Sequence, residues 1–193
     1  MSISISKTQI LLPKGLVTLG LLLMISTTLS SCLKIHAVKA KRGRNYESFL
    51  KPGGQMQYFI FPLEFKNKEE TVTIDFTLRS EFTSDSLVAA NFSVYTDKEF
   101  SSLMQATLHH ADGTSELMHI KKLFSEPSGN ARHYRFTSNL YFADILPLFS
   151  NPERTSIGIT QDNGAFVVNA TVKTQKILRQ LKEQITLLQG NKG

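Results

Sequence analysis

The sequence predicts an all-β domain, an antiparallel β-sandwich or jelly-roll-like fold of about eight strands with one C-terminal amphipathic helix. Three observations predict it. Apolar and polar side chains alternate with period two from residue 55 onward. Turn residues interrupt this alternation at short intervals. Residues 175–189 contain no Gly or Pro, and their apolar residues follow helical spacing.

The clearest predicted strand covers residues 71–79, whose alternate positions are apolar: Val72, Ile74, Phe76 and Leu78. Such alternation predicts one buried and one solvated face. Further strands are predicted at residues 59–65, 88–94, 103–110, 114–124, 131–142, 155–161 and 165–172.

Pro62 interrupts the strand predicted at residues 59–65. The apolar face of that strand is expected to consist of alternate residues: Phe59, Phe61, Leu63 and Phe65. A proline cannot donate a hydrogen bond to a sheet ladder, so this strand is predicted to lie at a sheet edge.

Three turn sequences predict hairpins. Asp112-Gly113 and Asn163-Gly164 are residue pairs that tolerate the positive φ of a type I′ turn, and Ser128-Gly129-Asn130 suits a longer loop. With Asp112-Gly113 as the turn, His109 is expected opposite Glu116 as a polar pair across the two strands.

Residues 175–189 are predicted to form one amphipathic helix that Gly190 ends as a C′ residue. The helix has a stripe of apolar residues: Ile177, Leu178, Leu181, Ile185 and Leu188. This stripe either docks on the protein's own β domain or stays free for a partner helix or anionic lipid. We expect docking, because an exposed stripe would promote aggregation.

The formal net charge of +6 is unevenly distributed along the chain, and what it implies about partners depends on where the basic residues lie. They gather in residues 33–51 and 173–193, whereas acidic residues outnumber basic ones in residues 52–172. A nucleic-acid-binding domain needs a basic face on its folded part, and an acidic body repels phosphate. We therefore expect no nucleic-acid partner.

Residues 1–31 have the features of a secretory signal peptide. Lys7 and Lys14 precede a short apolar run at residues 15–25, and polar residues 26–28 end that run. A membrane-spanning helix needs about 20 apolar residues, so an uncleaved membrane anchor is the weaker alternative.

Leu29, Ser30, Ser31 and Cys32 follow this run. An aliphatic residue, two small residues and a cysteine in this order resemble the lipobox of bacterial lipoproteins. The resemblance covers the leader only. It implies cleavage between Ser31 and Cys32 by the lipoprotein signal peptidase and a diacyl lipid anchor, such as palmitate, on Cys32. Cys32 is the only cysteine, so it has no disulfide partner within the chain.

Leu33 occupies the position after the cysteine, where an aspartate would resemble an inner-membrane retention signal. The residues that follow, Lys34, Ile35 and His36, are not acidic, whereas some surface-export signals are. We therefore expect a bacterial cell-envelope protein, anchored in the outer membrane and facing the periplasm.

These observations divide the chain into four parts. We expect a signal peptide at residues 1–31, a basic lipid-anchored tether at 32–55, a β-sandwich domain at 56–172, and a C-terminal helix and tail at 173–193. The tether ends at Pro52-Gly53-Gly54, and its basic residues could lie on anionic lipid or remain in solvent.

The residues that could carry chemistry do not form a recognisable site. His109, His110 and His119 fall in one predicted hairpin, but the expected register places them too far apart or on opposite faces for one metal ion. Adjacent Glu69 and Glu70 on a turn are expected to point apart into water rather than to act as a glycosidase pair. No Gly-x-Ser-x-Gly motif or phosphate-binding glycine loop occurs in the sequence. We expect no catalytic residue, cofactor or metal.

The predicted function is that of a non-catalytic, lipid-anchored envelope protein that serves as an interaction or assembly module. Its partners would be the membrane, through the lipid, and another envelope protein. The alternative is a β-sandwich that binds a polysaccharide or another ligand, although the chain has no Trp for a sugar platform. The tyrosines that could replace it are Tyr46, Tyr58, Tyr95, Tyr134 and Tyr141. An unrecognised hydrolase is the least favoured hypothesis.

Overall fold

The computed structural model describes residues 45–79, 83–100 and 102–190, with side chains as far as Ile185. The predicted signal peptide, the Ser31–Cys32 cleavage site and residues 32–44 of the tether lie outside this range. Within it, no helix is long and apolar enough to cross a bilayer.

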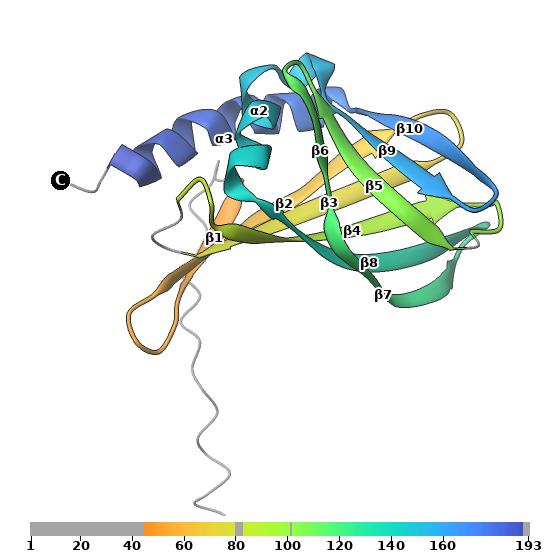
Figure 1. The fold of residues 1–193 in the computed structure, drawn as a ribbon, viewed down its shortest axis with the longest axis horizontal. Helices are drawn as coiled ribbons and strands as arrows, with labels where there is room; N and C mark the ends of the chain where they lie inside the picture. Colours follow the sequence, from red (N-terminus) through yellow and green to blue (C-terminus); the bar gives the residue numbers. More distant parts are fainter. Residues whose placement is uncertain (1–44, 80–82, 101, 191–193) are drawn as a thin grey trace, which may run out of the picture. The chain divides into compact units, whose positions relative to one another are not determined.

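The described chain contains ten strands and two α-helices, with one 3₁₀ turn between α2 and β9 (Figure 1). In chain order these elements are β1 (Tyr46–Leu50), β2 (Met56–Lys66), β3 (Thr71–Arg79), β4 (Leu87–Thr96), β5 (Leu103–His110), β6 (Gly113–Glu116), β7 (Met118–Ser128), β8 (Ala131–Tyr141), α2 (Phe142–Ser150), η1 (Pro152–Arg154), β9 (Ser156–Gln161), β10 (Gly164–Ala170) and α3 (Val172–Gly190). The predicted all-β class with a C-terminal helix is confirmed.

All strand pairs are antiparallel, and the strands form one sheet in the order β6-β5-β9-β10-β2-β3-β4-β8-β7, with β1 paired to β2. The two end strands, β6 and β7, are separated in the chain only by Leu117. The Leu117 amide still bonds to Ala106 of β5 at 2.9 Å, whereas Met118 already pairs with Asn139 of β8. The sheet therefore curls until the chain passes directly from one end strand to the other.

The core lies on the inner face of this curled sheet. The prediction for β3 is confirmed residue by residue, since Val72, Ile74, Phe76 and Leu78 are all at most 3% exposed. The same alternation continues in β4 and β8, where Phe92 stacks on Phe136 with ring centroids 5.0 Å apart. These side chains, brought together from distant strands, form a single apolar cluster.

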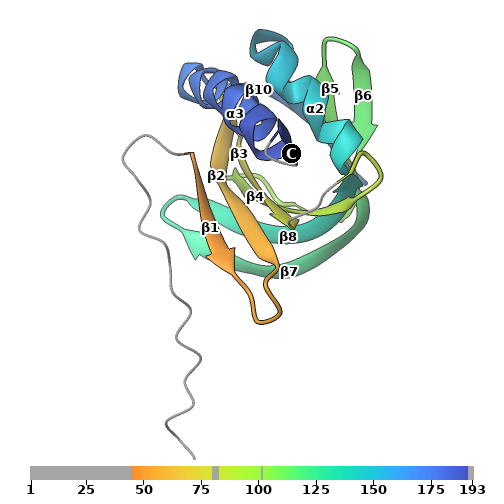
Figure 2. The ribbon, with the colours of Figure 1, turned by 90° about the vertical axis from the view of Figure 1, so that its left-hand side faces the viewer.

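The helices α2 and α3 lie side by side across one opening of the curled sheet (Figure 2). Leu178 and Leu181 of α3 are fully buried, so the expected docking of this helix is confirmed. Thr174 fixes its first turn, because its hydroxyl accepts the Glu64 amide at 2.8 Å and donates to the Glu64 carbonyl at 2.7 Å. An ion pair between Arg179 and Glu153 joins the helix to η1.

The prediction that Pro62 marks an edge strand is wrong. Strand β2 lies between β3 on one side and β1 and β10 on the other. Pro62 instead lies within a β-bulge between Ile60 and Leu63, where no ladder donor is needed. The bulge moves the inner face from Ile60 to Leu63, so Phe59, expected inside, is 37% exposed.

The hairpin turns lie one residue earlier than predicted. Gly113 pairs with His110 and Gly164 with Gln161, so each glycine follows the turn, with φ of 142° and 146°. The expected longer loop is a two-residue turn at Gly129 and Asn130, since Ser128 pairs with Ala131.

Other element boundaries also differ from the sequence prediction. The single strand predicted at residues 114–124 is divided at Leu117 into β6 and β7, and ten strands form instead of about eight. The tether was expected to extend to residue 55, but β1 pairs with the first half of β2, so Tyr46–Leu50 belongs to the sheet. The strand predicted to end at residue 142 ends at Tyr141, and Phe142 begins α2, a helix that the sequence analysis did not predict. Pro147 within α2 obscured its helical pattern.

We predict that Leu181→Asp lowers the free energy of unfolding by more than about 3 kcal/mol, because a charge replaces a fully buried side chain. Denaturant unfolding of the purified protein measures the change. Lys176→Asp is the control on the exposed face of the same helix and should cost no more than about 1 kcal/mol. Equal effects of the two substitutions would contradict the docked helix.

Candidate functional site

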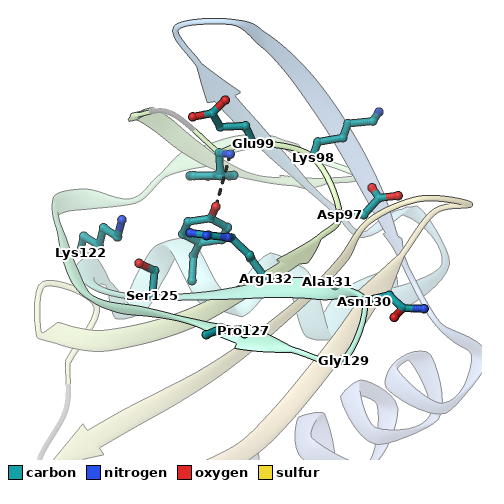
Figure 3. A pocket seen from close by; sticks show the side chains of 12 residues that line it. Asp97, Lys98, Glu99, Lys122, Ser125, Pro127, Gly129, Asn130, Ala131 and Arg132 are labelled. Atoms are coloured by element: carbon teal, nitrogen blue, oxygen red, sulfur yellow. Dashed lines mark hydrogen bonds between the residues drawn. The ribbon is translucent and has the colours of Figure 1, made fainter.

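A pocket of about 580 Å³ opens between the segment that follows β4 and the β7–β8 hairpin. Figure 3 shows Asp97, Lys98 and Glu99 along one side of this pocket, and Lys122 and Ser125 on the hairpin side. No local pattern in the sequence predicts this site, because its two sides come from segments that approach each other only through the curl of the sheet.

Two aromatic residues, Phe100 and Tyr134, belong to the core and also form the floor of the pocket. The Phe100 amide donates to the Tyr134 hydroxyl at 3.4 Å (Figure 3), and the two ring centroids are 4.9 Å apart. Both residues are at most 5% exposed. The Lys122 ammonium lies 5.1 Å from the centre of the Tyr134 ring and makes a cation–π contact with it.

The pocket carries charges of both signs. Asp97 and Glu99 on one side face a hairpin that carries Lys122 and Arg132. Charged groups around a pocket with a rigid floor can bind polar groups of a ligand or of a partner protein.

Lys98 is held by Glu69 and Glu70 through ion pairs. The hydrogen bond with Glu69 raises the pKa of Lys98 above its ordinary value, and the same bond lowers the pKa of Glu69. Glu70 is 5% exposed, and Asn67 Oδ1 accepts both glutamate amides, at 2.9 and 2.7 Å. The two glutamates, expected to point apart into water, therefore both bind one lysine.

A polar network crosses the outer face of the sheet over β3, β4, β8 and β7. Glu126 Oε1 lies 3.0 Å from His133 Nδ1, and His133 Nε2 lies 2.9 Å from Ser93 Oγ. Carboxylate, imidazole and hydroxyl thus follow one another in the order of a serine hydrolase triad. The sequence analysis missed this network, because pairing of β4 with β8 brings together Ser93 and His133 from 40 positions apart.

The surroundings of Ser93 do not suit a nucleophile. Its side chain is covered, with the residue only 2% exposed, and Arg135 Nη1 also donates to its hydroxyl at 3.0 Å. Its backbone pairs with Thr73 on one side and Arg135 on the other, in the middle of the sheet. A substrate carbonyl would have to displace packed side chains to reach Oγ.

Further contacts hold this outer network together. Arg135 forms an ion pair with Asp75, and Asn91 Nδ2 donates to the other Asp75 oxygen at 3.0 Å. The Tyr95 ring stacks on the His133 ring with centroids 4.5 Å apart. The Phe124 ring packs edge-on against the His133 ring, with centroids 5.2 Å apart. The network therefore connects four neighbouring strands.

The three histidines considered for a metal site, His109 and His110 of β5 and His119 of β7, are not among the pocket residues or the members of the outer network. The predicted pairing of His109 with Glu116 is wrong, because the earlier turn places His109 opposite Thr114. The His109 ring instead lies over Gly158, where an added Cβ would come within 2.6 Å of Nε2. Nε2 of His110 lies 3.2 Å from Ser115 Oγ.

His119, just after the passage from β6 to β7, is exposed and has a φ of 54°. Among the residues that the structure describes, no group of three His, Cys, Asp or Glu side chains could hold a metal ion.

The tyrosines considered for a sugar platform are distributed over different parts of the fold. The ring centroids of Tyr46 and Tyr58 are 5.9 Å apart. Partial burial raises the pKa of Tyr58 above its ordinary value, and the electrostatic effect of Tyr46 adds to this rise. Tyr95 covers His133, Tyr134 lies beneath the pocket, and Tyr141 is exposed at the end of β8.

Comparison of the chain with protein-family models, with curated proteins and with solved structures finds no match.

We predict that Ser93→Ala lowers the free energy of unfolding by about 1–3 kcal/mol, because Arg135 and His133 lose a buried partner. Denaturant unfolding measures this loss, with the exposed Ser125→Ala as a control of nearly unchanged stability. An esterase activity of the wild type that disappears in a stable Ser93→Ala protein would instead establish a catalytic serine.

Proposed function

We propose that this protein is a non-catalytic lipoprotein of the bacterial cell envelope, held at the outer membrane through lipid on Cys32, whose β domain binds another envelope protein. The observation that carries the proposal is the order Leu29-Ser30-Ser31-Cys32 after a short apolar run, with Cys32 as the only cysteine.

The covered position of Ser93 supports a non-catalytic role. A serine nucleophile needs an accessible hydroxyl and free donors for the oxyanion, whereas Ser93 is buried and its backbone is paired on both sides. The adjacent Arg135–Asp75 ion pair suits a network that holds strands together.

The pocket beside Phe100 is the surface that we assign to the protein partner. It combines Asp97, Lys98 and Glu99 on one side with basic residues on the hairpin side, and Phe100 and Tyr134 also line it. Protein interfaces use such mixed charges to orient a partner, and a rigid floor limits the loss of conformational freedom on binding.

Lipidation is tested by feeding labelled fatty acid to cells that produce the full chain. The label should enter the wild type and be absent from Cys32→Ala. Ser31→Ala keeps a small residue before the cysteine and should remain labelled. Label retained in Cys32→Ala would contradict the proposed anchor.

Partner binding is tested by photo-crosslinking in intact cells. A photoreactive residue at Lys122, in the pocket, should give one discrete crosslinked product, and Arg132→Glu should abolish that product by reversing a pocket charge. A photoreactive residue at Val167, which is 50% exposed on β10, is the control and should give none. Identical products from both positions would refute the pocket as the binding surface.

A further inference from the structure

We propose that the β1–β2 hairpin contacts the lipid surface on which Cys32 holds the domain, and that this surface is anionic. The inference rests on the proposed lipid anchor and adds which part of the fold faces the bilayer.

The tip of the hairpin extends beyond the rest of the sheet. Among the described residues, the β1–β2 ladder runs one pair beyond the last β2–β3 pair: Leu50 pairs with Met56, whereas the β2–β3 pairs end at Gln57 and Arg79. A tight turn closes the tip, with the Lys51 amide bonded to the Gln55 carbonyl at 2.8 Å. Figures 1 and 2 both show this orange turn projecting away from the curled sheet.

Apolar side chains lie exposed on this projecting element. Leu50 is 61% exposed at the tip, next to the exposed Lys51. Phe59, on the other face of the hairpin, is 37% exposed and packs edge-on against Phe49 with ring centroids 5.3 Å apart. Leu50 beside Lys51 at the tip suits the boundary between headgroups and acyl chains, whereas Phe59 lies farther along the hairpin, opposite Glu47.

The chain segment that leads to the anchor begins at the base of the same hairpin. The Asn45 carbonyl accepts the Phe61 amide at 3.0 Å, and Asn45 Nδ2 donates to Gln180 of α3 at 2.8 Å. Residues 33–44 connect this fixed point to Cys32, and a chain of that length spans at most roughly 45 Å. The five residues of β1 cover only about 17 Å, so the tip can reach the bilayer.

The charge of the connecting segment indicates which kind of lipid surface the hairpin would contact. The connecting segment is strongly basic, with Lys34, Lys39, Lys41, Arg42 and Arg44. Basic residues near a membrane are attracted to anionic headgroups. An anionic bilayer therefore complements the connecting segment, Lys51 and the exposed Leu50 together.

The absence of Trp from the chain makes a direct test feasible. Leu50→Trp places a single fluorescent reporter at the tip, and Met104→Trp places one at a similarly exposed position on β5, which is 66% exposed. The chain from Cys32 onward contains the whole described core, which runs from Ile60 to Ile185. Its sole cysteine is coupled to a maleimide lipid in vesicles that contain phosphatidylglycerol.

In the coupled protein, the emission of the Leu50→Trp reporter should shift to shorter wavelength and be quenched by brominated acyl chains. The Met104→Trp reporter should show neither change. Unchanged emission of the Leu50→Trp reporter on coupling overturns the inference, and so does equal quenching of both reporters. A blue shift without quenching by brominated lipid also overturns it, because a second copy or a protein would then cover the tip.

Chemical coupling at Cys32 does not depend on lipidation in cells. The result therefore separates the two proposals. Absence of fatty-acid label from the wild type refutes the natural anchor alone, whereas an unshifted Leu50→Trp reporter refutes the membrane-contacting hairpin alone.

Discussion

Strands β3, β4 and β8 bury alternate apolar side chains on one face of the sheet, and the need to cover that face governs the rest of the described fold. Curling brings the inner faces of distant strands into one cluster, and α2 and α3 cover the remaining opening. Just beyond the last β10–β2 pair, the Thr174 hydroxyl bonds to both backbone groups of Glu64, and the Thr171 amide donates to the same carbonyl at 3.2 Å, so the start of the helix is fixed to β2. Burial of Leu178 and Leu181 then completes the core.

The same curl creates the pocket. The chain leaves β4 and turns over the end of the β7–β8 hairpin, and Phe100 and Tyr134 pack together between pocket and core. Phe100 and Tyr134 are nearly fully buried and Asp97 and Arg132 are exposed, whereas Lys98 pairs with the buried Glu70.

The outer face shows how a catalytic order of residues can arise for structural reasons. Glu126, His133 and Ser93 follow the triad order because each lies at an outward position on a neighbouring strand, where cross-strand polar contacts form. Arg135 and Asp75 extend the contacts to β3. A catalytic serine would need an accessible hydroxyl and unpaired backbone donors nearby. Ser93 is buried and its backbone is paired, so both criteria indicate a structural role for this residue.

The sequence by itself determined the all-β class, the strand at residues 71–79 with its buried face, and the amphipathic C-terminal helix, because each depends on periodicity within one segment. Only the tertiary structure decided the bulge at Pro62, the pairing of β4 with β8, and the passage from β6 to β7 at opposite ends of the sheet order. These features depend on contacts between residues far apart in the chain, which leave no local pattern. Ser93 and His133, 40 positions apart, meet only because the sheet pairs their strands in this register.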